Sequence, residues 1–173
     1  MRAYHDTEWG VPVTEDVELF ERLSLECFQA GLSWQTILNK RDAFRAAFRG
    51  FDPVIVSAFD EADRARLMAD AGIIRNRAKI AATIGNAQAF RAVVAEFGSF
   101  DAYLESIVPR PPVPLPATAT MADIPATTPV SDVLAKDLRR RGFGFVGSTI
   151  MYAFMQSVGL ADDHLPGCFR YRG

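Results

Sequence analysis

The stretch Ala71-Gly72-Ile73-Ile74-Arg75-Asn76-Arg77-Ala78-Lys79 spans the junction of two predicted helices and is the most informative part of the chain. Before it, Asp60 is a candidate N-cap for a helix that runs to about Ala71. After it, helical spacing of apolar residues predicts a long helix from Arg75 to Phe97, which ends at Gly98. A helix, a short turn of glycine and apolar residues, and a second helix that begins with arginine place backbone N–H groups and cations at one point. This arrangement favours contact with a phosphate of DNA.

Helical signals continue through most of the remaining chain. Apolar residues recur at helical spacing after candidate capping residues, and no stretch shows the alternation of a β-strand. We therefore predict an all-α protein of several short helices. Besides Asp60, the predicted caps are Thr14, Ser33, Asp52, Ser99, Ser131 and Ser148.

A proline-rich segment interrupts this pattern. Residues 109–129 hold seven of the ten prolines and little charge, which predicts an extended connection. With 173 residues and 49% hydrophobic content, the chain is long enough for one ordinary core but has little left for a second. We therefore predict a single domain over residues 1–173, with the 109–129 connection inside it.

The formal net charge of −2 conceals an uneven distribution. Side-chain charges sum to −5 in residues 1–26, to +4 in residues 27–91 and to −1 in residues 92–173. Arg75, Arg77 and Lys79 are the most specific basic cluster, because they follow the glycine turn. For this cluster and for Arg139–Arg141, a solvated helix face remains the alternative to a phosphate contact.

Two features bear on the compartment. The start of the chain has no apolar segment typical of a secretory signal, so we expect a reducing, cytoplasmic environment. Residues 142–161 carry no charge and follow three arginines, as a membrane span would. Eight of these 20 positions are Gly, Ser, Thr or Gln, which favours a loop followed by a buried helix. We expect no association with a membrane.

Few side chains are candidates for chemistry. Glu26 lies late in an amphipathic helix, close in sequence to Trp34, so the two can share a pocket. The alternative is an exposed helix carboxylate that reaches water. His164 and Cys168 are four residues apart in a non-helical tail, a spacing that can chelate a metal ion. This pair alone is a weak signal, and no local pattern connects it to His5.

Several separated motifs resemble the 3-methyladenine DNA glycosylase I family, in the same order and over essentially the whole chain. They are Ala3-Tyr4-His5-Asp6-Thr7-Glu8-Trp9-Gly10-Val11-Pro12, Leu25-Glu26, Gln29-Ala30-Gly31-Leu32-Ser33-Trp34, Ala71-Gly72-Ile73-Ile74-Arg75, Arg140-Arg141-Gly142-Phe143-Gly144-Phe145-Val146-Gly147, Phe154-Met155-Gln156, Asp163-His164 and Gly167-Cys168. The resemblance implies a helix-hairpin-helix fold. It also implies a monofunctional enzyme that flips 3-methyladenine out of alkylated duplex DNA, hydrolyses its N-glycosidic bond and leaves an abasic site.

The resemblance also implies roles for individual residues. Glu26 is the expected catalytic residue and would hydrogen-bond the excised base. The other base-binding residues would be Tyr4, Trp34, which stacks on the base, and Trp9, which walls the pocket. The residues that would contact DNA are Leu32, where the duplex is wedged open, and the hairpin residues Gly72, Ile73, Arg75, Arg77 and Lys79.

The resemblance further implies a structural zinc ion. His5, His164 and Cys168 match three of the family's four zinc ligands. The fourth is a cysteine in the dozen or so residues that precede the Tyr-His motif in the family, and this chain starts at Met1. We therefore expect zinc to bind weakly.

One absence bears on the substrate range. Many helix-hairpin-helix glycosylases carry an aspartate soon after the hairpin, and here no Asp occurs between Gly72 and Asp101. This predicts weak activity on neutral bases, whose glycosidic bonds are more stable than that of a cationic base.

Two rival hypotheses come from other functional classes. One is a helix-hairpin-helix module that binds DNA but has lost excision. The other is a metal-dependent hydrolase that uses His5, His164 and Cys168. None of these hypotheses requires an obligate protein partner.

Overall fold

Nine α-helices and no β-strand make up the computed structural model, which describes residues 1–173. The predicted all-α class is confirmed. The helices are α1 (Arg2–Thr7), α2 (Asp16–Gln29), α3 (Trp34–Ala47), α4 (Pro53–Val56), α5 (Glu61–Ala69), α6 (Arg77–Phe97), α7 (Phe100–Glu105), α8 (Pro129–Arg140) and α9 (Ser148–Ser157). No helix combines the length and apolarity needed to cross a membrane.

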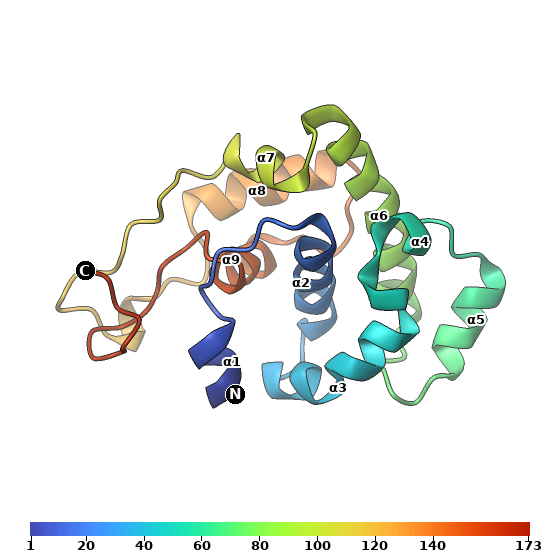
Figure 1. Ribbon diagram of the computed structural model, residues 1–173, viewed down its shortest axis with the longest axis horizontal. Helices are drawn as coiled ribbons and strands as arrows, with labels where there is room; N and C mark the ends of the chain where they lie inside the picture. Colours follow the sequence, from blue (N-terminus) through green and yellow to red (C-terminus); the bar gives the residue numbers. More distant parts are fainter.

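Helix α2 lies at the centre of the molecule, with α3, α6, α7 and α9 around it (Figure 1). Every residue from Leu19 to Phe28 is buried, so this half of α2 has no solvent face. Its apolar residues belong to one cluster of 35 buried hydrophobic side chains, in which Phe28 packs against Phe44 and Phe48. Any polar side chain in this part of α2 is therefore held rigidly inside the protein.

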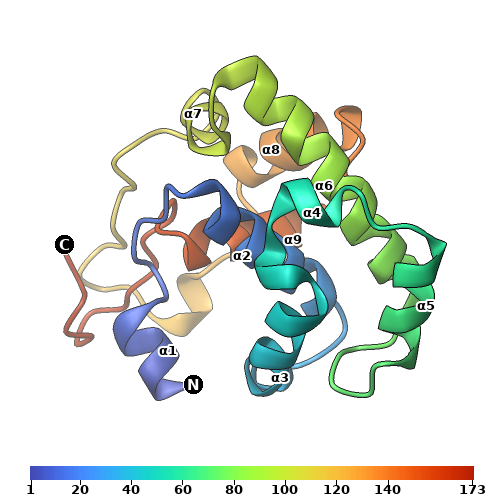
Figure 2. The ribbon, with the colours of Figure 1, turned by 45° about the vertical axis from the view of Figure 1, so that its right-hand side comes forward.

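Helices α5 and α6 form a pair at one edge of the molecule (Figure 2). Asp60 caps α5, as predicted, and forms a capping box with Asp63. Helix α6 begins at Arg77 and not at Arg75, because the side chain of Asn76 accepts the backbone N–H of Lys79 and acts as the cap.

Three other predicted caps need correction. The N-cap of α2 is Glu15 and not Thr14, and that of α9 is Gly147 and not Ser148. Helix α8 begins at Pro129 because Thr128 is its cap, and Ser131 is the third helical residue of the same capping box. Helix α1 was not predicted, since its six residues bury only Tyr4 and carry no apolar period. The segment before α8 is mostly extended, as its prolines predict, with a turn at residues 117–118 and a short 3-10 helix at Met121–Asp123.

The segment that follows α1 is tied to the end of α9. Gly10 N–H donates to the carbonyl of Gln156, and Val13 N–H donates to that of Val158. Gly159 makes this close approach possible: its φ is +75°, and a Cβ there would lie 2.8 Å from the backbone nitrogen of Pro12. The position of α1 thus depends on a glycine more than 150 residues away.

Gly159→Ala should destabilise the protein more than Gly142→Ala does. Both glycines have positive φ, so alanine at either position has a strain cost of about 1–2 kcal/mol. A Cβ at Gly142 meets no atom within 4 Å, whereas a Cβ at Gly159 meets backbone atoms of Val11 and Pro12. Urea unfolding should show at least about 2 kcal/mol of extra loss for Gly159→Ala. Equal losses would contradict the proposed close approach.

Candidate functional site

A cavity of about 310 Å³ opens between α1, α2, α3 and α9. The structure brings together in it Tyr4, Trp9, Glu26 and Trp34, the four residues that the resemblance groups as base-binding. The other lining residues are Met1, His5, Gln29, Ala153 and Gln156. This volume is at the lower end of the range of about 300–1,000 Å³ for small-molecule pockets. The cavity therefore suits a small, flat ligand.

Glu26 is the buried acidic group of this cavity. It lies in the last turn of α2, is 5% exposed, and forms no side-chain hydrogen bond with the protein. Burial raises its pKa to about 8, and the nearby Arg22 guanidinium opposes part of this shift. At neutral pH the empty site therefore holds mostly the neutral acid. A cationic ligand would stabilise the ionised form.

The aromatic walls carry two donors without partners. The rings of Tyr4 and Trp34 lie 5.4 Å apart between centroids, with planes tilted by 51°. Tyr4 Oη and Trp34 Nε1 are buried and have no hydrogen-bond partner in the protein. Buried polar atoms are nearly always paired, so these two atoms are free to bind a ligand. Burial also raises the pKa of Tyr4 to about 12, so its hydroxyl remains protonated.

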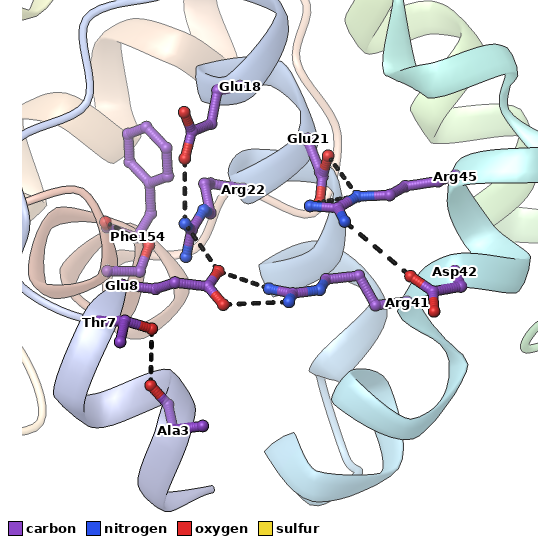
Figure 3. Close-up of polar contacts among 11 residues, drawn as sticks. Ala3, Thr7, Glu8, Glu18, Glu21, Arg22, Arg41, Asp42, Arg45 and Phe154 are labelled. Atoms are coloured by element: carbon purple, nitrogen blue, oxygen red, sulfur yellow. Dashed lines mark hydrogen bonds and ion pairs between the residues drawn. The ribbon is translucent and has the colours of Figure 1, made fainter.

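Ion pairs hold α1 against α2 and α3 (Figure 3). Glu8, which follows α1, accepts from Arg22 of α2 at 3.1 Å and from both terminal nitrogens of Arg41 of α3 at 2.5 and 3.0 Å. The guanidinium of Arg22 also lies over the ring of Tyr4, 5.6 Å from its centroid. These contacts fix Tyr4 at the cavity. The sequence could not identify them, because the pairs join residues 14 and 33 positions apart.

His5, His164 and Cys168 form a second cluster beside the cavity. Their ligand atoms lie within 4.8 Å of one another, and Cys168 Sγ lies 3.6 Å from His5 Nε2 and 3.7 Å from His164 Nδ1. Zn–S and Zn–N bonds of ordinary length in a tetrahedron place S and N about 3.5 Å apart, so the donor set fits zinc. His5 Nδ1 bonds the carboxylate of Asp6 at 2.9 Å, a contact that orients the ring.

The cluster of His5, His164 and Cys168 and the cavity share structural support. The ring of Trp9 stacks on His5 and meets His164 edge-on, and His5 itself lines the cavity. Gly10 leaves room for this arrangement, because a Cβ there would lie 2.6 Å from His164 Nε2. The structure therefore joins His5 to the C-terminal tail, which spacing in the sequence could not do.

The predicted DNA-contacting residues lie outside the cavity, on two turns. Leu32 is 40% exposed in the turn between α2 and α3, where Gly31 has a φ of +81°. Arg75 and Arg77 are exposed at the turn between α5 and α6. Ile73 is buried, so it offers only its backbone to a partner.

The turn between α5 and α6 packs against α3. Lys40 of α3 donates to the carbonyls of Ala71 and Gly72, and a Cβ at Gly72 would lie 3.0 Å from that of Ala43. The N–H of Gly72 already donates to Asp70 Oδ1 at 2.7 Å, so the prediction of free backbone donors does not hold for Gly72.

Lys79 requires a correction. It is 7% exposed, and its Nζ donates to the carbonyls of Phe28 and Ala30 at 2.9 and 2.7 Å. An ammonium group occupied in this way is not available to a phosphate. In the cluster Arg139–Arg141, Arg140 and Arg141 also form ion pairs within the protein: Arg140 pairs with Asp137, and Arg141 pairs with Glu96 and Asp137.

Gln29 and Gln156 line the cavity without having been predicted as site residues. Gln156 donates to Asp163 Oδ2 at 2.7 Å, which holds its side chain beside the cavity. The sequence pointed to them only through the motifs that carry the family resemblance, in which both occur. A glutamine outside such a motif has no chemistry that marks it as a site residue.

Comparisons with known proteins point to one family. The family model described as methyladenine glycosylase matches residues 1–171. DNA-3-methyladenine glycosylase 1 of Escherichia coli (strain K12) is 52% identical over 171 residues, which cover 99% of this chain and 91% of that protein. A crystal structure of 3-methyladenine DNA glycosylase I superposes with a TM-score of 0.94 at 50% identity, over 99% of this chain and 93% of that one. The Staphylococcus aureus enzyme, studied for its recognition of 3-methyladenine, superposes with a TM-score of 0.94 at 35% identity, over 99% of this chain and 91% of that one.

The burial of Glu26 predicts a pH-dependent stability change for Glu26→Gln. The carboxyl ionises above pH 4.5 in the unfolded chain but only near pH 8 in the folded protein, so the wild type loses stability as pH rises between these values. Glutamine has no such loss. In thermal and urea unfolding, the gain from Glu26→Gln should be small at pH 5 and reach about 2–4 kcal/mol at pH 9.

Glu105→Gln, at an exposed carboxyl on α7, is the matched control and should show no such trend. A gain from Glu26→Gln that is the same at pH 5 and pH 9 would show that Glu26 ionises normally in the folded protein.

Proposed function

The chain belongs to the methyladenine glycosylase family, and we propose that it hydrolyses the N-glycosidic bond of 3-methyladenine in alkylated duplex DNA. The products are the free base and an abasic site. The observation that carries this proposal is that Tyr4, Glu26 and Trp34 line one cavity.

The chemistry of the substrate explains why so small a set of residues suffices. Methylation at N3 gives the base in DNA a positive charge. When the C1′–N9 bond breaks, its electron pair moves to the base, which leaves as a neutral molecule, and water adds to the sugar. The leaving group is thus already activated, and the protein needs mainly to extract and hold the base.

Glu26 and Trp34 supply the attraction for the cation. A carboxylate at Glu26 favours the positively charged base in a site with little water to screen it. The face of Trp34 adds a cation–π interaction of about 1–2 kcal/mol in a desolvated pocket. The unpartnered Tyr4 Oη gives the base a further hydrogen bond, and Trp9 closes the wall of the pocket.

The same site explains a narrow substrate range. No Lys lines the cavity, and Met1, which does line it, donates from its ammonium group to Gln35 Oε1 at 3.4 Å, so we infer a monofunctional reaction with water. No Asp occurs between Gly72 and Asp101 to promote loss of a neutral base. We therefore assign high activity only to bases whose glycosidic bond is weakened by positive charge.

The two exposed turns supply the contacts with DNA. In this proposal α5, the Gly72 turn and α6 form a helix-hairpin-helix unit, whose exposed Arg75 and Arg77 contact phosphates. Leu32 is an exposed apolar side chain in the turn between Gln29 and Trp34, two residues that line the cavity. Insertion of such a side chain between base pairs fills the space left by the flipped nucleotide.

We also propose a structural zinc ion on His5, His164 and Cys168. Bound there, it would be a cross-link and not part of the reaction. It would tie α1 to the C-terminal tail and so help to hold Tyr4 at the cavity.

Incubation with N-methylated duplex DNA should yield free 3-methyladenine, measured by chromatography. Glu26→Gln should lower the single-turnover rate by about 10- to 100-fold, because a hydrogen bond to a charged group is lost. Zinc content, measured in the same preparations, should not change. No release from the wild type at high enzyme concentration would favour a module that only binds DNA. Full activity of Glu26→Gln would show that the carboxyl of Glu26 has no role in base excision.

Protein dialysed against excess zinc should bind about one zinc ion per chain, and Cys168→Ala should not, as measured by mass spectrometry. The cluster offers three donors, so the fourth position of a tetrahedral zinc ion must be filled by a donor outside the cluster. We therefore expect a chelator to remove the ion and to lower the unfolding temperature. Cys27→Ala removes the only other cysteine and should keep the metal. Zinc that resists the chelator would contradict weak binding, and equal zinc in Cys168→Ala would exclude the cluster.

A further inference from the structure

Lys79 is a buried cation that the proposed reaction does not use. It stands in the first turn of α6, two residues after the exposed Arg77, yet its side chain points into the protein. Its Nζ donates to the carbonyls of Phe28 and Ala30 at the end of α2. No carboxylate pairs with it. Its partners are the backbone of the segment that leads from Glu26 to Leu32.

These carbonyls are a suitable site for a cation. The last carbonyls of a helix have no intrahelical donor, and the helix dipole gives that end negative character. In α2 the carbonyl of Gln29 accepts the N–H of Leu32 at 2.6 Å, and Lys79 satisfies the carbonyls on either side of it. Burial lowers the pKa of Lys79, and hydrogen bonds to these two acceptors offset part of the cost of burying its ammonium group.

The contact spans two turns that are far apart in sequence. Lys79 lies about 50 positions from the α2–α3 turn, which carries the exposed Leu32. Its own backbone N–H is bonded to Asn76, the cap of α6, so the lysine is fixed at the turn between α5 and α6. One side chain therefore joins the turn that bears Arg75 and Arg77 to the turn that bears Leu32.

We infer that Lys79 is a positioning residue that couples the phosphate-contacting turn to the wedge, so that engagement of the backbone of DNA sets where Leu32 enters the duplex. The inference rests on the proposed function. It requires that Lys79 act through Leu32 and not through a phosphate or through the base pocket. These three routes predict different measurements.

The test compares Lys79→Met, which keeps the apolar stem and removes the donors, with Arg77→Met, which removes an exposed cation two residues away. For each we measure the single-turnover release of 3-methyladenine from duplex DNA, the affinity for free 3-methyladenine by tryptophan fluorescence, and the salt dependence of duplex binding. All assays run well below the unfolding temperature of the variant.

Lys79→Met should slow release from duplex DNA by at least about tenfold, as misplacement of a positioning group does. It should bind free 3-methyladenine within about twofold of the wild type and keep the salt slope of duplex binding, whereas Arg77→Met should reduce that slope by about one unit. The double variant Lys79→Met/Leu32→Ala should be no slower than Leu32→Ala alone, because residues that act through one another are not additive.

Each other outcome overturns the inference. A reduced salt slope in Lys79→Met would make the lysine a phosphate contact, and a parallel loss of free-base affinity would make it a general structural support. Additive effects in the double variant, or a wild-type rate in Lys79→Met, would exclude action through Leu32. If methionine prevents folding, Lys79→Gln, which keeps a neutral donor, takes its place. Failure of the wild type to release the base would instead overturn the proposed function.

Discussion

Burial of the C-terminal half of α2 on all sides is the constraint on which the rest of the structure depends. Glu26 lies in this buried half and forms no side-chain hydrogen bond with the protein, so burial raises its pKa and favours the neutral acid until a cationic ligand or a rise in pH favours the carboxylate. The same packing fixes the end of the helix, from which the next turn departs. The packing around α2 thus determines both the protonation of Glu26 and the position of the turn between α2 and α3.

Three unlike kinds of interaction hold the elements around the cavity together. Ion pairs of Glu8, which salt screens, tie the segment after α1 to α2 and α3, and the cluster of His5, His164 and Cys168, our proposed metal site, lies between α1 and the C-terminal tail. The α5–α6 turn is held through hydrogen bonds from a buried ammonium group to carbonyls. Because we expect these three interactions to differ in sensitivity to salt, to a metal chelator and to pH, each can be weakened separately.

The all-α fold and about half of the helix caps could be predicted because capping residues and apolar spacing are local signals. Ser33, Asp52, Asp60 and Ser99 act as the sequence indicates. Ser131 does not, because Thr128 competes for the same role three residues earlier. Whether a given side chain is buried was harder to predict. Lys79 and Arg77 look alike in the sequence, and only tertiary packing sends one into the protein. Helix α1 escaped prediction because its supports lie up to 163 positions away.

These distances have a consequence for how the protein is made. A ribosome synthesises the chain from its N-terminal end, so Tyr4, Glu26 and Trp34 emerge well before Gln156 to Cys168, the residues that brace α1 from the other side. Closing such long loops is the slow part of assembly. A nascent chain that has not yet reached Cys168 therefore carries residues of the pocket without the contacts that hold α1 in place, and we expect base binding only after this segment has emerged.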